Sequence, residues 1–481
     1  MEHMPLRISH QPNVPGRGIV ASYGARFWAL VLAIGVGAGL AGAALMELLR
    51  AVQRLAWRPA GATFVDAVRA APAARHLAVL ALAGALARAG VLLARRLARG
   101  HGAAETTEAL WLHDGVLRLP ASLARGVTSI VAVAMGASLG REGAPQLAGA
   151  ALASRAAAWA GLPSWQRRLL VACGAGAGMA AVYDVPLGGA LFALEVLLGT
   201  LALPLVLPAL ATTLTATAVA WIALPDHAVY RLPHVDPSAS QVAFAALAGP
   251  LAGLAAVLWV RLIARASALR PHSARARLLV PVAVFAALGA VSIAFPQLLG
   301  NGLEIVQGSL LGQLSVGLLA ALLVLKPLAT AACLGSGAPG GLFTPTLALG
   351  VLLGALAGHA WALAWPGAAV GGCALVGGAA VLAAAMQGPL AAVVIAFELT
   401  RASDALMVPV LVAVTGATVV ARLLRADSIY SARLPQYAAS LPRAGGESEA
   451  PMPPDPRPPA EPAGRLRPAR AGRSAGAARV R

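Results

Sequence analysis

Residues 136–145 read Gly-Ala-Ser-Leu-Gly-Arg-Glu-Gly-Ala-Pro and place Arg141 and Glu142 between glycines. Largely apolar sequence lies on both sides, at 126–139 and 147–161. A charge within a bilayer costs at least about 2.5–3.5 kcal/mol, so it is usually kept for a function. The glycines end one helix, and the next run begins another, whose free N–H groups would lie near Glu142. Because a helix N-terminus attracts anions, this stretch predicts a membrane anion site with a carboxylate beside it. The alternative is an Arg–Glu salt bridge at a helix end.

The composition indicates an all-α polytopic membrane protein. Of 481 residues, 59% are apolar and only 12% charged, and the mean hydropathy is +0.76, whereas soluble chains carry about 25% charged residues. The net charge of +18 comes mostly from arginines that flank apolar runs or lie in the tail. Positive flanks of membrane helices explain that pattern better than a nucleic-acid partner does. The three cysteines lack metal-ligand spacing and exclude a disulfide framework.

The chain divides into three parts by composition. We expect a cytosolic N-terminal segment at 1–26, a transmembrane domain at 27–435 and a disordered cytosolic tail at 436–481. We expect this tail to be too short for a folded regulatory domain. Apolar runs in the transmembrane part, several too short to span upright, occupy 27–49, 76–97, 168–181, 186–200, 201–224, 242–263, 278–295, 314–325, 346–365, 368–385, 389–397 and 405–424.

The transmembrane part contains an internal repeat. Residues 185–195 read Val-Pro-Leu-Gly-Gly-Ala-Leu-Phe-Ala-Leu-Glu, and 388–398 read Gly-Pro-Leu-Ala-Ala-Val-Val-Ile-Ala-Phe-Glu. Each Pro-Leu follows a glycine-led helix start, at Gly140 and Gly341, by 46 and 48 residues. Interrupted apolar segments in matching places of two halves indicate a transporter's binding site. We therefore predict inverted halves at about 30–230 and 240–430, with Gly140 and Gly341 close together near the membrane midplane.

Three motifs in order resemble the CLC family of chloride channels and chloride/proton antiporters. They are Gly-Arg-Glu-Gly at 140–143, Gly-Leu-Phe-Thr-Pro at 341–345 and Ile-Tyr-Ser-Ala at 429–432. The resemblance covers roughly residues 30 to 435. It implies a homodimer with one anion pathway per subunit, built from inverted repeats of tilted and broken helices. It further implies a multi-pass protein of a bacterial inner membrane, whose partners are chloride or a similar small anion, protons and the lipid bilayer.

The resemblance assigns roles to particular residues. Glu142 is similar to the gating glutamate, whose carboxylate occupies an anion site when ionised and leaves it on protonation. Leu342 and Phe343 resemble positions whose backbone N–H groups hold the central anion, and Tyr430 resembles the tyrosine whose hydroxyl does so. A phenol donates one hydrogen bond without a charge that would trap the ion. The full set expected to bind the anion is His101, Gly140, Arg141, Gly143, Gly341, Leu342, Phe343 and Tyr430.

The sequence departs from the family pattern at three positions. His101 stands where the family has an anion-binding serine, and its imidazole can donate, accept or carry a charge near neutral pH; the alternative is a histidine turned to water. Ala144 replaces a proline, which shifts the helix start. The antiporters' inner proton-accepting glutamate aligns with Val196. Glu195 precedes it, but adjacent helical residues point about 100° apart, and the match to Glu398 indicates a structural role.

Proton exchange is therefore predicted with Glu142, His101 and Glu195 as candidate proton sites, and a passive anion channel is the alternative. Selectivity for another anion, such as nitrate or fluoride, is also open. Arg125 and Arg141 could attract anions, although pairing with carboxylates such as Glu195 and Glu398 is favoured. The sequence lacks the nucleophile or metal-ligand spacing of an intramembrane enzyme, so we expect neither catalysis nor a metal or cofactor. A secondary transporter of carboxylates would need a wider cavity than two helix ends provide.

Overall fold

Helices form the regular structure of the part of the chain that the structure describes, and strands are absent from that part. The structure is a computed structural model that describes residues 23–98, 105–236 and 238–434. Within these ranges, 8 helices are long and apolar enough to cross a membrane. The predicted all-α polytopic fold class is confirmed.

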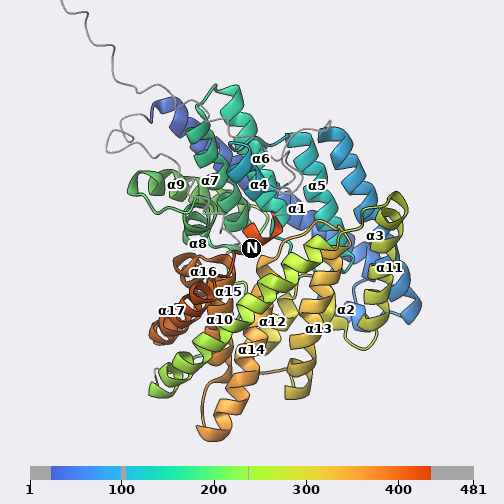
Figure 1. The fold of residues 1–481 in the computed structure, drawn as a ribbon, viewed down its shortest axis with the longest axis vertical. Helices are drawn as coiled ribbons and strands as arrows, with labels where there is room; N and C mark the ends of the chain where they lie inside the picture. Colours follow the sequence, from blue (N-terminus) through green and yellow to red (C-terminus); the bar gives the residue numbers. More distant parts are fainter. Residues whose placement is uncertain (1–22, 99–104, 237, 435–481) are drawn as a thin grey trace, which may run out of the picture. The chain divides into compact units, whose positions relative to one another are not determined.

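The first half contains the helices α1 to α9, with the π-helix η2 directly after α8 (Figure 1). Their bounds are α1 Ala25–Trp57, α2 Phe64–Arg69, α3 Ala73–Ala98, α4 Thr106–Leu112, α5 Leu119–Ala134, α6 Gly143–Trp159, α7 Ser164–Tyr183, α8 Pro186–Leu191, η2 Phe192–Leu197 and α9 Leu203–Ala220.

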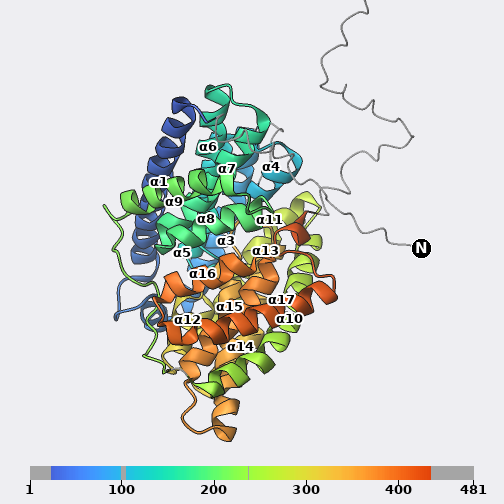
Figure 2. The same cartoon turned by 90° about the vertical axis from the view of Figure 1, so that its left-hand side faces the viewer.

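The second half contains α10 to α17 and three short 3-10 helices (Figure 2). Their bounds are α10 Ala239–Ala268, α11 Ala274–Ser292, η3 Pro296–Leu298, α12 Leu303–Leu310, α13 Val316–Gly335, α14 Phe343–Ala364, α15 Val370–Met386, α16 Pro389–Thr400, η4 Asp404–Leu406, α17 Met407–Leu423 and η5 Ser431–Arg433.

The two halves break their helices in the same way. In the first half α7 ends at Asp184, with φ 54°, and in the second α15 ends at Gln387, with φ 58°. Two residues later α8 begins with Pro186 and α16 with Pro389. Proline lacks an N–H group and suits the first turn of a helix, where that group would have no partner. The repeated Pro-Leu in the sequence is thus a repeated helix start.

Small residues bring the core helices of each half into close contact. A Cβ atom on Gly149 of α6 would lie 2.0 Å from the carbonyl oxygen of Gly174 on α7. The counterpart in the second half is Gly350 of α14, where a Cβ atom would lie 2.6 Å from the carbonyl oxygen of Gly377 on α15. Helices in a membrane associate through such close backbone approach. These pairs fix α6 and α14, the two helices whose starts form the site.

The prediction for the run at 314–325 was too short. Helix α13 continues through Lys326 and Pro327 to Gly335. The Lys326 side chain is 1% exposed, and its Nζ donates to the carbonyl oxygens of Leu298 (3.0 Å) and Gly300 (2.8 Å). A buried amino group needs such partners, and neither of them could be predicted from the local sequence. The short helix α12 was not predicted.

The predicted terminal segments lie wholly or mostly outside the described residues. This applies to the N-terminal segment at 1–26, of which only the last four residues are described, and to the tail at 436–481. The domain boundaries therefore stay predictions.

Candidate functional site

The two glycine-led helix starts are directly bonded to each other. The Gly140 N–H donates to the Gly341 carbonyl at 2.8 Å, and the Gly341 N–H donates to the Gly140 carbonyl at 2.9 Å. A Cβ atom on either glycine would lie 2.0 Å from Oε1 of Glu142. Glycine is therefore needed at both positions for the carboxylate to lie where it does. The prediction that the two glycines lie close together is confirmed.

The Glu142 carboxylate lies at the N-terminus of the opposite half's helix. Glu142 is the residue before α6 and is 1% exposed. Its Oε1 accepts a hydrogen bond from the Phe343 N–H (2.8 Å), at the start of α14, and its Oε2 accepts from the hydroxyls of Tyr183 and Thr344 (both 3.1 Å). The two hydroxyls also contact each other at 2.6 Å. One backbone N–H group and two hydroxyls at a helix N-terminus form a set of donors suited to any small anion.

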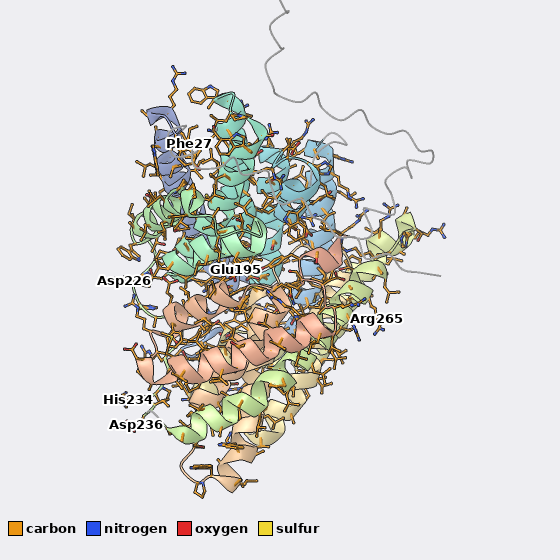
Figure 3. The ribbon with its side chains drawn as sticks, turned by 60° about the vertical axis from the view of Figure 1, so that its left-hand side comes forward. Phe27, Glu195, Asp226, His234, Asp236 and Arg265 are labelled. Carbon is orange, nitrogen blue, oxygen red and sulfur yellow. The ribbon has the colours of Figure 1, made fainter. Side chains whose placement is uncertain are left out.

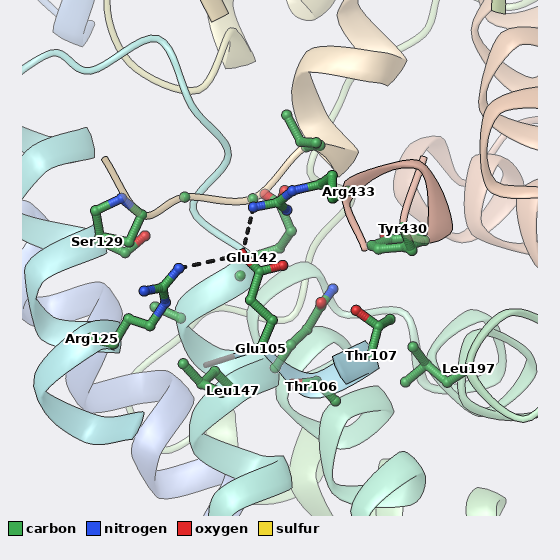
Figure 4. A pocket seen from close by; sticks show the side chains of 18 residues that line it. Glu105, Thr106, Thr107, Arg125, Ser129, Glu142, Leu147, Leu197, Tyr430 and Arg433 are labelled. Atoms are coloured by element: carbon green, nitrogen blue, oxygen red, sulfur yellow. Dashed lines mark hydrogen bonds and ion pairs between the residues drawn. The ribbon is translucent and has the colours of Figure 1, made fainter. Parts of the chain in front are cut away.

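A cavity of about 80 Å³ reaches Glu142 from the side of Tyr430 (Figure 4). We call it the inner cavity. At its wall, Glu105 makes ion pairs with Arg125 (3.3 Å) and Arg433 (2.6 Å). The Tyr430 hydroxyl has a 4.0 Å contact with Sδ of Met386, a weak acceptor. The cavity is lined by Glu105, Thr106, Thr107, Arg125, Gly126, Ser129, Glu142, Gly143, Ala144, Gln146, Leu147, Leu197, Pro339, Gly340, Gly341, Leu342, Tyr430 and Arg433.

A larger cavity, of about 580 Å³, lies beyond Tyr183, and we call it the outer cavity. Arg141 and Tyr183 both line it, and the Arg141 guanidinium lies 5.1 Å from the centre of the Tyr183 ring. Glu304, Asn301 and Gln297 also line it. Glu142 lines the inner cavity, and its hydrogen-bond donor Tyr183 lines the outer one. The carboxylate and its donors thus lie between the two cavities.

The comparisons with known proteins identify the family. Residues 83–422 match the voltage-gated chloride channel family, and the chain is 37% identical to a ClcB-like protein of Ralstonia nicotianae over 83% of this chain and 95% of that relative. The chain belongs to the voltage-gated chloride channel family. It is also 33% identical to the voltage-gated ClC-type chloride channel ClcB of Salmonella typhimurium, over 82% of this chain and 96% of that relative.

Solved structures of chloride-channel family members share the fold. A slow cyanobacterial Cl⁻/H⁺ antiporter aligns with a TM-score of 0.76 over 87% of this chain and 100% of that chain, at 22% identity. A CLC-type fluoride/proton antiporter aligns with a TM-score of 0.67 over 85% of this chain and 97% of that chain, also at 22% identity. These two likenesses show the fold. Because the family match makes the chain a member of a family of transporters and channels, it is a membrane transport protein and not an enzyme.

The predicted site residues fall into three groups. The first group surrounds the Glu142 carboxylate and consists of Gly140, Gly341 and Phe343. The inner cavity is lined by Gly143, Gly341, Leu342 and Tyr430. Arg141 faces the outer cavity. His101 lies outside the described residues.

Glu195 lies away from the inner cavity, where α8 and η2 meet α16 (Figure 3). Its oxygens accept from the N–H groups of Leu390 (3.2 Å) and Ala391 (2.6 Å), in the first turn of α16. Glu398 makes the corresponding contacts in the other half. It accepts from the N–H groups of Leu187 (3.0 Å) and Gly188 (2.7 Å), in the first turn of α8. Glu195 therefore caps α16, which carries Glu398, and Glu398 caps α8, which continues directly into η2 with Glu195. This agrees with the matched positions of the two glutamates in the repeat.

Sequence reasoning missed several partners. The hydroxyls of Tyr183 and Thr344 were not anticipated, although Thr344 lies within the quoted motif at 341–345. Arg125 was expected to pair with a carboxylate such as Glu195 or Glu398, but its partner is Glu105. That pairing joins α5 to the start of α4 across 20 residues, and no local pattern marks it. Within the described residues, no cluster of three or more potential metal ligands is present.

Proposed function

We propose that this protein transports chloride or a similar small anion through the two cavities, with Glu142 as the gate between them. The single observation that supports this most is the buried Glu142 carboxylate at the N-terminus of α14, held by donors that would serve an anion equally well. An ionised Glu142 fills this place. A protonated Glu142 loses the charge that favours it there, so an anion can take the same donors.

The anion route proposed here uses donors from both halves. The N–H group of Leu342 and the hydroxyl of Tyr430 would hold the anion on the inner side of Glu142. The Phe343 N–H would join them when the Glu142 carboxylate leaves it. Arg141, in the wall of the outer cavity, would raise the anion concentration there. Gly140, Gly143 and Gly341 let the backbone approach the ion closely. His101 is the remaining proposed ligand.

We further propose that anion transport is coupled to proton exchange. Glu142 would carry the proton on the outer side and His101 on the inner side, because Val196 cannot titrate and Glu195 caps α16. Glu105 also lines the inner cavity, but its two arginine partners hold it ionised. It therefore serves as a fixed charge and is a poor proton acceptor. A passive channel is the alternative.

The deciding experiment measures chloride and proton flux together in proteoliposomes. The reversal potential is recorded under a tenfold proton gradient, worth about 1.4 kcal/mol per proton. A shifted reversal potential supports exchange, and a reversal potential indifferent to the gradient leaves the passive channel. His101→Ala should abolish the shift if His101 is the inner proton site. Repeating the measurement with nitrate and fluoride identifies the preferred anion, and absence of any anion flux would refute the proposed function.

We also propose that the protein forms a homodimer and that it lies in a bacterial inner membrane, as the bacterial sources of its relatives favour. The capping glutamates support the homodimer. Glu195 and Glu398 are only partly buried, and they lie beside the exposed Leu187 (49%) and Leu390 (48%). Because carboxylates facing lipid are costly, this face needs a cover, and a second copy of the chain would supply it. Light scattering in mild detergent should give the mass of two chains. A monomer mass at micromolar concentration would contradict the proposal.

A further inference from the structure

A third cavity, of about 730 Å³, lies at the ends of helices in the first half, and we call it the basic cavity. It shares no described lining residue with the inner or the outer cavity. Its described wall contains four arginines and no acidic residue. Arg96 lies in the last turn of α3, Arg118 directly before α5, Arg155 on α6 and Arg167 on α7. The cavity thus has the size of a ligand site and a wall of one charge sign.

Two hydrogen bonds fix the segment that forms one wall of the basic cavity. Ser154 Oγ on α6 is buried and accepts from the Leu117 N–H at 2.9 Å. Arg167 Nε on α7 donates to the Asp114 carbonyl at 2.8 Å. The segment between α4 and α5 is therefore held against both α6 and α7. The basic cavity is a built part of the fold and not a gap between loose side chains.

The four arginines of the basic cavity have no counter-charge in the protein. Within the described residues, none of their guanidinium groups takes part in an ion pair. Holding like charges around one cavity is unfavourable unless an anion lies between them. Guanidinium groups bind phosphate through paired N–H donors, and basic pockets between membrane helices bind phospholipid headgroups. The wall therefore favours a phosphate group as its ligand.

Apolar side chains beside the basic cavity favour a lipid as the source of that phosphate. Arg96 lies in the last turn of α3, which is long enough to span a membrane, so the cavity lies at the level of the bilayer surface. The exposed Leu97 is also in the wall. Leu119, in the same wall, begins a stripe along α5 that continues with the exposed Leu123 and Val127, one and two turns further on. Acyl chains would lie along this stripe.

We propose that the basic cavity binds the phosphate of an anionic phospholipid, whose acyl chains lie along Leu119, Leu123 and Val127. The phosphate would join α3, α5, α6 and α7, which pack on one another in that order. Because α6 begins directly after Glu142, the lipid would brace the far end of a helix that starts at the gate. The inference does not rest on the proposed anion transport, since its ligand and its residues are different.

The test measures lipid binding to the purified full-length chain by native mass spectrometry. Phosphatidylglycerol and phosphatidylcholine with identical acyl chains are titrated separately, because both carry a phosphate but only the first has a net negative charge. We expect phosphatidylglycerol to bind at least about tenfold more tightly, which is about 1.4 kcal/mol. A variant with both Arg118→Gln and Arg155→Gln should lose most of this preference. Within the described residues neither side chain makes an ion pair, so the variant removes no internal salt bridge.

The matched control carries Arg261→Gln and Arg265→Gln near the end of α10, outside the basic cavity (Figure 3). It removes the same charge and should keep the wild-type preference. Equal loss in the control and in the cavity variant would show a general charge effect and overturn the proposal. Equal affinity of the wild type for the two lipids would also overturn it.

Inorganic phosphate distinguishes a lipid from a soluble ligand. Added to the complex with phosphatidylglycerol, it should leave the lipid bound, because the acyl chains contribute to the affinity. Complete displacement would assign the cavity to a soluble phosphate and refute the lipid. A cryo-electron microscopy map of the unmodified protein in phosphatidylglycerol nanodiscs is independent of variant folding. Headgroup density against Arg118 and Arg155 supports the proposal, and an empty cavity in a map that resolves both side chains contradicts it.

Discussion

At the scale of single residues, the Glu142 carboxylate occupies a set of donors that would also bind a free anion. Its carboxylate accepts hydrogen bonds from the Phe343 N–H and from the hydroxyls of Tyr183 and Thr344. Any change that removes the negative charge therefore makes those donors available to an anion. We predict that Glu142→Gln, which resembles the protonated acid, keeps anion flux and loses its dependence on pH. Chloride efflux measured between pH 4.5 and 7.5 tests this. A variant with wild-type pH dependence would show that Glu142 is not the gate.

Gly341 offers a second residue-scale prediction that leaves the carboxylate in the chain. In Gly341→Ala the new Cβ would lie 2.0 Å from Glu142 Oε1, so the side chain must leave the Phe343 N–H. We expect chloride efflux to fall severalfold at every pH, because the same methyl group would crowd the place that an anion takes when Glu142 leaves. The control is Gly317→Ala in α13, where a Cβ meets nothing within 4 Å and flux should not change. Chloride efflux at the wild-type rate in a folded Gly341→Ala protein would contradict the geometry.

The partners of Glu142 and Glu105 show what could not be predicted from the sequence at the scale of single residues. The residues at 140–143 and 341–345 could be recognised because their spacing repeats. Tyr183 and Glu105 acquire their roles only from neighbours far away in the sequence. The Tyr183 hydroxyl, for example, meets Thr344, 161 residues away. No local pattern encodes such a pairing.

At the scale of helices, the reciprocal capping of α8 and α16 makes a paired prediction. Glu195→Ala leaves the N–H groups of Leu390 and Ala391 unpaired, and Glu398→Ala does the same for Leu187 and Gly188. Each loss should cost about 1–3 kcal/mol locally. Hydrogen exchange followed by mass spectrometry should therefore speed up at the start of α16 in the first variant and at the start of α8 in the second. Equal changes at both helix starts in either variant would contradict independent caps.

Helix starts were easier to predict than helix ends. Pro186 and Pro389 mark starts in the sequence because proline suits a first turn. Asp184 ends α7 in a left-handed conformation, and its carboxylate accepts from Arg401 (2.9 Å) and from the Trp221 indole (3.0 Å). Both partners lie far away in the sequence, so no local pattern marks this helix end. Lys326 was outside the predicted run because its carbonyl partners lie in another segment.

At the scale of the whole molecule, an ion-pair cluster joins the two halves outside the membrane-spanning helices. Arg401, from the second half, binds Asp184 and Asp226, from the first. The hydrogen bond from Arg401 lowers the pKa of Asp226 below its ordinary value. A carboxyl group with a lowered pKa contributes stability above the unfolded value of about 3.9, and this stability is lost as the pH falls through the folded pKa.

We therefore predict that the thermal stability of the wild type is insensitive to this cluster's titration at pH 5–8 and falls only in stronger acid. In Arg401→Gln, part of the acid-dependent loss of thermal stability should be absent. The substitution should therefore lower the melting temperature more at pH 6 than below pH 3. Melting curves across this range measure it. The same acid sensitivity in both proteins would show that the cluster contributes little, as is common for exposed ion pairs.

The bonded glycines at the centre of the molecule have a mechanical consequence. Two hydrogen bonds hold Gly140 against Gly341, and separating the halves there would break both at once. The Glu142 side chain needs only rotations about its own bonds to leave its place. We expect the backbone around the two glycines to stay rigid while the Glu142 side chain rotates. Rotation of a side chain is a faster class of motion than hinge movement of whole domains. The rate at which anions pass Glu142 would therefore depend on the rotation of one side chain.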